Sequence, residues 1–541
     1  MADIAILWHQ SLNATLVAAE RKHHCEFRGI KYASIPNRFE HSVLVEKRDG
    51  QTLDCTKFGP RCPQPFRDVA GFYSLPADQK MPPPIPEDEF ECLNLVVSVP
   101  HSVLRNTAAK VPVLVWFHGG AHAYTMVNIE QGFTGRVVLY TSIDVRMMPP
   151  LTNELIEDPS DIIQHSLEMG KPIIMIHVAY RLNVLGYSVF KYKTNFGLHD
   201  QKRAVEWVIK HIGHFGGDKA KITISGESSG ALDVHALIHG PAAVRGVKQA
   251  ILQSGSLYLT GPAPKSSGIA VMERTASEAR LSIAELQSMP VKELMASIGK
   301  LGIKAYGLHH EEGVFELGSG EDEWPISDSP ELESVMVSDC EWESRGFEAA
   351  IMSLGLENLK HYFLSCWSDV GREIVELYGI EFSSLEVARP AISAFVNDAR
   401  FALAAHKIWQ LELKAGKRRC YRYMMDQYNP WNSAVRAQHA IDLLFLYGGP
   451  YDYSSDYGAV KVSFDIREKF VKFLYGDEPW AQHSTYAFGP GGETGPVSSE
   501  ELGKRRRIEK IEKLDKIGWK RFQPLLARLL SLKGTVAEAY L

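Results

Sequence analysis

The pentapeptide Gly226-Glu227-Ser228-Ser229-Gly230 stands between two segments of opposite pattern. Residues 221–225 before it are rich in β-branched side chains and are short enough for a buried strand. Residues 231–239 after it follow a helical pattern that stops at a Gly-Pro pair. A G-x-S-x-G sequence between a strand and a helix predicts a tight turn that exposes the serine hydroxyl as a nucleophile.

Strands and helices alternate along the chain around this turn. Short apolar runs or β-rich segments predict further strands at residues 111–117, 172–180, 247–253, 334–339 and 419–425. A helical apolar stripe covers 200–213, and most of 242–440 reads as helical insertions. This succession predicts an α/β fold with a mostly parallel, twisted sheet and helices on both faces.

Two regions outside this pattern carry separate predictions. The segment 68–91, within the lid-like loop expected over 62–92, has a proline-dense centre at 81–86, which excludes a helix or a central strand, and loops of this length are often lids or binding loops. C-terminal helices are expected over 500–541, among them one charged helix over 504–520, after a Gly/Pro/Ser-rich loop at 488–499. The basic run 504–507 is interpreted as a solvated helix start rather than a nuclear signal.

Composition excludes several classes of partner and places the chain among ordinary globular proteins. The 541 residues carry a net charge of −6 with 45% hydrophobic residues, so nothing predicts a nucleic-acid partner. We expect no membrane span, because no apolar run reaches about 18 residues. The N-terminus lacks the basic and apolar regions of a signal peptide, and seven cysteines are an odd number, so we expect a cytoplasmic protein.

A serine hydroxyl is a weak nucleophile at neutral pH and needs an adjacent base. Where the serine lies in such a turn, an acid and then a histidine follow it along the chain. Of the 20 histidines, His439 opens a loop-to-helix junction after the strand expected at 419–425, and we predict that it is the base. Three candidate acids lie at or after the strand expected at 334–339, and residue chemistry alone does not separate them: Asp339, Glu341 and Glu343.

Backbone N–H groups are needed where negative charge develops in acyl transfer. The glycine-rich residues 118–121 follow the strand expected at 111–117 and offer such donors, together with the N–H of Ser229. We therefore predict an oxyanion hole at this turn.

Two histidine patterns are weak indications of metal binding. His235 and His239 have zinc-pair spacing, but Ala236 stands where a metalloprotease needs glutamate, so core histidines are expected. The His-His-Glu-Glu run at 309–312 has no partner at ligand spacing and is interpreted as a solvated loop. We expect no metal site and no organic cofactor.

The chain resembles the type B carboxylesterase/lipase family of α/β-hydrolases, including its intracellular fungal members. The matching segments span most of the chain: 58–64, 180–182, 195–201, 206–208, 215–230 and 253–255. The resemblance implies one α/β-hydrolase domain over 1–541, with large helical insertions and a gorge leading to the serine. It also selects site residues: a triad of Ser228, Glu343 and His439, oxyanion donors at Gly120, Ala121 and Ser229, and a possible disulfide between Cys62 and Cys92.

The chain departs from the family pattern at two positions near the expected oxyanion hole. Ser229 stands where alanine is usual, which should be harmless because the donor is the backbone. His122 stands where phenylalanine is usual, which puts an imidazole near the acyl pocket.

The resulting prediction is a serine carboxylesterase that hydrolyses a small-molecule ester through an acyl-enzyme. One alternative is a hydrolase, acyl transferase or cyclase of a natural-product pathway that uses the same triad on an ester or lactone. The other is a non-catalytic, cholinesterase-like binding protein. Substrate identity and oligomeric state stay open.

Overall fold

The computed structural model describes residues 5–65, 73–74, 86–106, 108–124, 157–240, 243–314, 331–448 and 453–530. Within these ranges a sheet of 13 strands has the order β1-β2-β3-β7-β9-β8-β10-β11-β12-β13-β14-β15, with β6 beside β2. Its strands are β1 Ile6–His9, β2 Ala14–Glu20, β3 His24–Lys31, β6 Thr52–Cys55, β7 Asn94–Pro100, β8 Val111–Phe117, β9 Ile174–Val178, β10 Gly217–Glu227, β11 Gln249–Gln253, β12 Ser334–Cys340, β13 Arg419–Met425, β14 Thr485–Phe488 and β15 Thr494–Val497. A small separate sheet pairs β4 Ala33–Ser34 with β5 Val43–Leu44.

The helices lie between and after these strands. They are α2 His101–Leu104, α3 Ser160–Glu168, α4 Asn183–Gly186, α5 Phe196–His211, α6 Ser229–Ile238, α7 Lys265–Ala279, α8 Val291–Leu301, α9 Arg345–Met352, α10 Leu356–His361, α11 Ser368–Tyr378, α12 Leu385–Asn397, α13 Leu403–Ala415, α14 Ile441–Tyr447, α15 Tyr457–Tyr475, α16 Ser499–Arg506, α17 Ile508–Ile517 and α18 Trp519–Leu530. None of the helices in the described ranges is long and apolar enough to cross a membrane.

The centre of the sheet is parallel, as the sequence pattern predicts. Strands β9, β8, β10, β11, β12, β13 and β14 pair in parallel, whereas β1-β2-β3-β7-β9 and β14-β15 pair antiparallel. Because parallel strands end at one edge, the loops after β8, β10, β12 and β13 lie together there. In α/β proteins this carboxyl edge is where ligands bind.

Both faces of the sheet are buried, which explains the continuous apolar strands. Along β8 the side chains of Val113 and Val115 belong to one core cluster, and those of Leu114 and Trp116 to another. Successive side chains of a strand point to opposite faces, so the two clusters lie on opposite sides of the sheet. Helix α5 contributes to the first cluster and α15 to the second.

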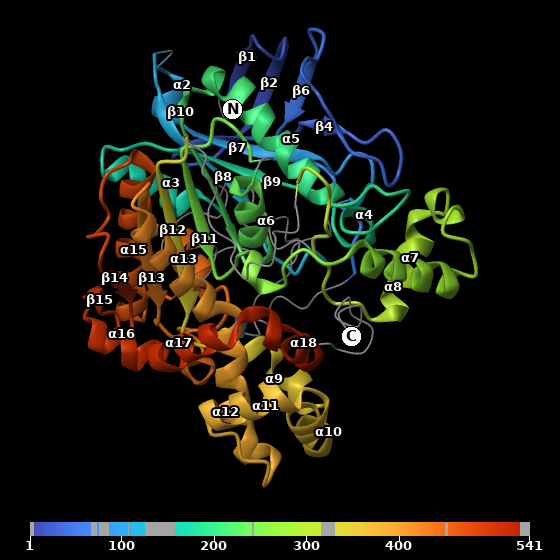
Figure 1. Ribbon diagram of the computed structural model, residues 1–541. Helices are drawn as coiled ribbons and strands as arrows, with labels where there is room; N and C mark the ends of the chain where they lie inside the picture. The colour runs from blue at the N-terminus through green and yellow to red at the C-terminus, as the bar shows by residue number, and fades with distance from the viewer. Residues whose placement is uncertain are drawn as a thin grey trace, which may run out of the picture.

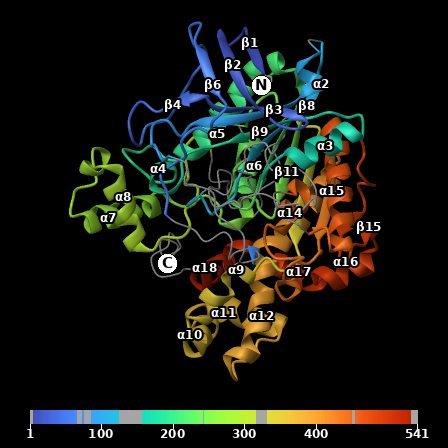
Figure 2. The ribbon, with the colours of Figure 1, turned by 180° about the vertical axis from the view of Figure 1, so that it is seen from behind.

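The helical insertions extend beyond the sheet. Figures 1 and 2 both show α9 to α12 as a group of helices on the far side of α17 and α18 from the sheet, and α7 with α8 as a second group at the side. These groups follow β11 and β12, so they extend from the carboxyl edge of the sheet. Most of the predicted lid-like loop at 62–92 lies outside the described residues, and its role stays a prediction.

Two expectations for the C-terminal region are wrong. The loop expected at 488–499 is an antiparallel hairpin of β14 and β15: three glycines and one proline occupy the short turn at 489–493, while Gly495 and Pro496 lie in the paired strand β15. The single charged helix expected over 504–520 is broken at Arg507, whose φ of 52° is incompatible with a continuing right-handed helix.

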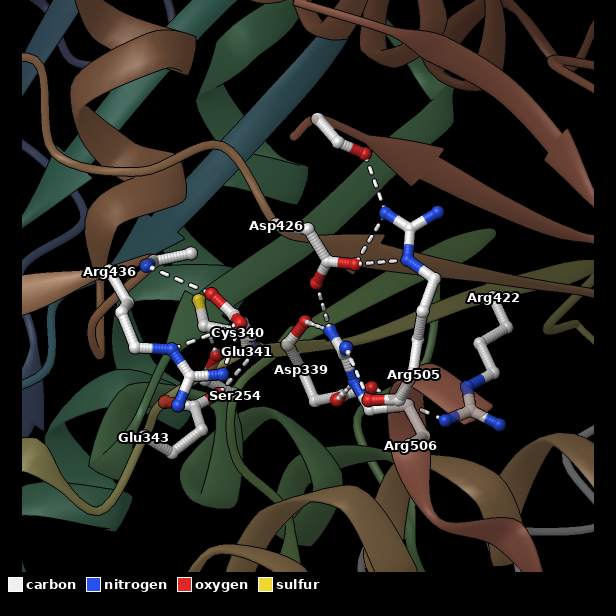
Figure 3. A network of polar contacts seen from close by, with 12 residues as sticks. Ser254, Asp339, Cys340, Glu341, Glu343, Arg422, Asp426, Arg436, Arg505 and Arg506 are labelled. Atoms are coloured by element: carbon white, nitrogen blue, oxygen red, sulfur yellow. Dashed lines mark hydrogen bonds and ion pairs between the residues drawn. The ribbon is translucent and has the colours of Figure 1, made fainter. Parts of the chain in front are cut away.

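The basic run that breaks this helix is not a solvated helix start. Arg506 is 1% exposed and donates to Asp426 Oδ1 at 2.7 Å and to Asp339. Arg505 also donates to Asp426, and Arg507 pairs with Asp398. Figure 3 shows Arg506 between the two carboxylates that it pairs. The run therefore anchors α16 to the ends of β12 and β13, and only Lys504 is widely exposed.

Candidate active site

The predicted turn after β10 is present and is strained. Ser228 lies between β10 and α6 with φ 55° and ψ −120°, a conformation that costs a non-glycine residue free energy and is typical of functional sites. A Cβ on Gly226 would lie 2.4 Å from the carbonyl carbon of Gly230, and one on Gly230 would lie 2.2 Å from Phe117 O. Glycine is therefore required at both ends, and the Ser228 side chain stays half-buried at the edge of the sheet.

The structure distinguishes the three candidate acids, among which residue chemistry does not choose and the family resemblance selects Glu343. Asp339 is committed to Arg506 and lies 3.3 Å from Arg422. Glu341 pairs with Arg436 in the neighbouring loop. Figure 3 shows both pairs.

Glu343 is the candidate that contacts the predicted histidine. Its Oε2 lies 2.5 Å from His439 Nδ1, and its Oε1 accepts the Cys340 N–H at 2.7 Å. The carboxylate is 0% exposed, so the hydrogen bonds replace water. The loops after β12 and β13 are joined by a further hydrogen bond from Trp342 N–H to Ala437 O.

A second carboxylate, which the sequence reasoning missed, contacts the other side of the imidazole. Glu227 Oε1 lies 3.0 Å from His439 Nε2, and Glu227 is 1% exposed. Burial raises the pKa of Glu227. Burial also acts to lower the pKa of His439, but the carboxylates of Glu227 and Glu343 outweigh it and raise that pKa. A glutamate at the end of the buried half of β10, next to the serine, is the signal that could have identified this residue.

The glycine-rich turn after β8 lies beside Ser228. Gly120 has φ 114°, and a Cβ there would lie 2.0 Å from Tyr124 O. Within the described ranges, no hydrogen-bond acceptor is found for the backbone N–H groups of Gly120, Ala121 and Ser229. The turn is therefore a concave set of donors in which only glycine fits at position 120.

These groups line one cavity of about 530 Å³. Its polar wall includes Ser228, Glu343 and His439 together with the turn at Gly120 and Ala121. The cavity is also lined by apolar side chains, which include Leu232, Leu259, Phe347, Phe401 and Leu530. A volume of this size accommodates a small-molecule ligand.

Comparison with known proteins agrees with this geometry. The model of the family described as "Carboxylesterase family" matches residues 14–144 and 152–300. Lipase 3 of Yarrowia lipolytica is 31% identical over 520 residues, which cover 94% of this chain and 96% of that protein. The chain belongs to the carboxylesterase family. It is a carboxylic ester hydrolase, and the predicted family and α/β-hydrolase fold are confirmed.

Two further matches show the range of this family. A crystal structure of the Geobacillus stearothermophilus carboxylesterase EST55 has the same fold, with a TM-score of 0.68 at 20% identity, and the match covers 92% of this chain and 99% of that one. A protein of Byssochlamys spectabilis named "Inactive carboxylesterase-like protein VdtD" is 30% identical over 242 residues, 43% of this chain and 35% of that protein. Family membership therefore leaves the roles of individual residues to be tested.

The two departures from the family pattern lie in contact with each other in this carboxylesterase. The Ser229 hydroxyl accepts the His122 N–H at 3.3 Å, so it braces the turn at 120–122. The His122 ring is 1% exposed, and its Nε2 lies 3.0 Å from Asp233 Oδ2 while its Nδ1 faces Tyr306 O. The imidazole expected near the acyl pocket is thus held by hydrogen bonds at both nitrogens.

The two cysteines of the disulfide expected from the family resemblance are free thiols in the structure. Cys62 and Cys92 are both buried. The pKa of the Cys92 thiol is raised, mainly by its hydrogen bond with Cys62 and also by burial. Cys62 Sγ also accepts the Leu182 N–H at 3.3 Å. The two thiols are neighbours in the reduced form, and their pairing stays a prediction.

The remaining histidine patterns have different outcomes. His235 is a core histidine as expected, because it is 0% exposed and its Nδ1 accepts the Leu257 N–H at 3.2 Å. The interpretation of 309–312 as a solvated loop is wrong, since His309 is 0% exposed and Glu311 contacts His199. The sequence around Glu311 does not predict its contact with His199, because His199 lies 112 residues earlier in the chain.

Proposed function

We propose that this carboxylesterase hydrolyses its ester through an acyl-enzyme on Ser228. The Ser228 oxygen attacks the ester carbonyl while His439 takes the hydroxyl proton. The ester C–O bond then breaks, and His439 returns the proton to the leaving alcohol. A water molecule releases the acid by the same route in reverse, with Glu343 orienting and stabilising the imidazolium.

One observation carries this proposal: the 2.5 Å contact between Glu343 Oε2 and His439 Nδ1. It joins loops from two strands beside a serine in a strained turn, and all three side chains line the same cavity. The contact leaves His439 Nε2 as the atom for the Ser228 proton. This atom contacts Glu227 in the structure, so the proposal requires it to exchange that contact for the Ser228 hydroxyl.

We assign the oxyanion donors to the N–H groups of Gly120, Ala121 and Ser229. The turn that carries two of them is braced by the Ser229 hydroxyl and by the contact of His122 with Asp233. Loss of one such donor typically costs about 10²–10³ in rate. Bracing by buried groups keeps these donors in place before the charge develops.

The cavity favours esters with an apolar acyl group, because most of its lining surface is hydrocarbon. The experiment is a p-nitrophenyl ester series of increasing acyl length, measured without added metal. We expect turnover that rises from acetate to medium chains. An absence of turnover across the series, together with no labelling by a fluorophosphonate, would contradict the proposal and favour a binding protein. Product analysis in ¹⁸O-water distinguishes hydrolysis from acyl transfer.

The contact between His439 and Glu227 predicts a specific pH dependence. The imidazole must be neutral to act as a base, and the two carboxylates raise its pKa, so kcat/KM should rise with pH along a limb set by His439. Replacing Glu227 with glutamine removes one negative charge. The limb should therefore move to lower pH, by about 1–3 units for a charge at this distance. The measurement is kcat/KM against pH for wild type, Glu227→Gln and the control Glu341→Gln; equal limbs in all three would contradict this account.

A further inference from the structure

Three potential metal ligands from distant parts of the chain meet away from the catalytic residues. His41, His199 and Glu311 each offer one ligand atom, and these atoms all lie within 4.8 Å of one another. All three residues are half-buried. His199 is in the first turn of α5, and His41 lies between β4 and β5, which contact α5. Figures 1 and 2 show β4 beside α5 in both views.

The pair formed by His199 and Glu311 already has the separation of two ligands on one ion. His199 Nε2 lies 3.0 Å from Glu311 Oε1. Two ligand atoms on a tetrahedral zinc are about 3.3 Å apart, given metal–ligand distances of about 2.0–2.2 Å. The His41 ring stacks on the His199 ring with centroids 3.9 Å apart. A small movement of the His41 ring therefore brings its Nδ1 to an ion bound between His199 and Glu311.

The surroundings supply the outer contacts that ligand side chains need. His41 Nε2 lies 3.0 Å from Thr194 O, which can only accept, so Nε2 carries the proton and Nδ1 keeps its lone pair. Glu311 Oε2 accepts a hydrogen bond from Asn195 Nδ2 at 2.9 Å. Metal-binding histidines characteristically donate their second N–H to a carbonyl or carboxylate, and binding carboxylates are themselves hydrogen-bonded.

We propose that His41, His199 and Glu311 bind one zinc ion, with the remaining position open to solvent. Two imidazoles and one carboxylate are a donor set that suits zinc. In the structure the proton between His199 and Glu311 holds their contact; zinc replaces that proton, which is released to solvent. The ion would stabilise the fold, and no step of the proposed ester hydrolysis uses it.

The ion would fix a segment that supports the oxyanion turn. Glu311 follows His309, whose N–H donates to Asn195 Oδ1 at 2.8 Å. Earlier in the same segment, Tyr306 N–H donates to Ala121 O at 2.9 Å. Zinc on Glu311 therefore ties this segment to α5 and stabilises the folded chain by binding it.

The test uses the full chain after treatment with EDTA and dialysis, with zinc chloride alone as the probe. We expect calorimetry to give one zinc per chain, and zinc to raise the unfolding temperature. X-ray absorption should report nitrogen and oxygen ligands without sulfur. Glu311→Gln keeps the shape and the acceptor for Asn195, but should weaken binding at least about 10-fold and abolish the shift in unfolding temperature.

The matched control is Glu312→Gln, the same change one residue later at an exposed position. It should bind zinc as the wild type does. Absence of zinc binding by the wild type overturns the site, and so does equal affinity in wild type and Glu311→Gln, which would place the ion elsewhere. Because these readouts do not depend on turnover, they stand apart from any failure of ester hydrolysis.

Discussion

Replacing Ser228 with alanine is expected to lower kcat for ester hydrolysis by on the order of 10⁵–10⁶. The substitution removes the only atom that forms the covalent bond in the proposed reaction, and a water molecule in its place has no fixed position. Binding of the ester should change little, because the apolar wall of the cavity is untouched. The measurement is steady-state hydrolysis of a medium-chain p-nitrophenyl ester, with KM determined separately from kcat.

The neighbouring serine provides a matched control for this experiment. Ser229→Ala keeps the backbone N–H that we assign to the oxyanion hole and removes only the hydroxyl that accepts the His122 N–H. We expect a loss of at most about 10-fold, since one bracing hydrogen bond contributes about 1 kcal/mol. A loss in Ser229→Ala that equals the loss in Ser228→Ala would contradict the assignment of the nucleophile.

Replacing Glu343 with glutamine is expected to lower kcat by on the order of 10⁴, as for an amide in place of a triad acid. The amide nitrogen can donate to His439 Nδ1, which favours the tautomer that carries its proton on Nε2. That tautomer cannot accept the Ser228 proton. The 2.5 Å contact and the full burial of the carboxylate make this the second large effect. Circular dichroism and thermal unfolding should show that the variant folds.

The Glu341→Gln variant tests whether the loss of activity is specific to Glu343. Glu341→Gln removes a charge two residues earlier, but that carboxylate pairs with Arg436 rather than with His439. We expect a loss of activity below about 10-fold, in line with the small contribution of partly exposed ion pairs. A larger loss in Glu341→Gln than in Glu343→Gln would overturn the choice of acid.

The sequence predicted the scaffold well because strong local signals determine it. Continuous apolar runs gave the positions of β8 and β9, and glycines at 226 and 230 gave the turn at Ser228. The hairpin of β14 and β15 was missed because glycine and proline in its turn resemble an irregular loop. Here pairing between strands outweighed local propensity.

Charged residues were predicted less well, since their environment depends on partners far along the chain. Arg506 belongs to a basic run that is typical of a solvated helix, yet its side chain is buried and forms ion pairs with Asp339 and Asp426. The same limit applies to the acid. Residue chemistry left three candidates open and only the family resemblance selected Glu343, whereas the fold pairs Asp339 with two arginines and brings Glu343 to His439. Glu227 belongs to the pentapeptide that predicts the turn, but its contact with His439 depends on a loop more than 200 residues later.

The most direct test of the central claim is to locate a covalent adduct by mass spectrometry. The folded chain is treated with a fluorophosphonate, digested, and the peptide containing Ser228 is sequenced. We predict one adduct per chain, on the Ser228 oxygen, and none in Ser228→Ala. Labelling of Ser228→Ala to the same extent as wild type, or an adduct on another residue while Ser228 stays unmodified, would contradict the account.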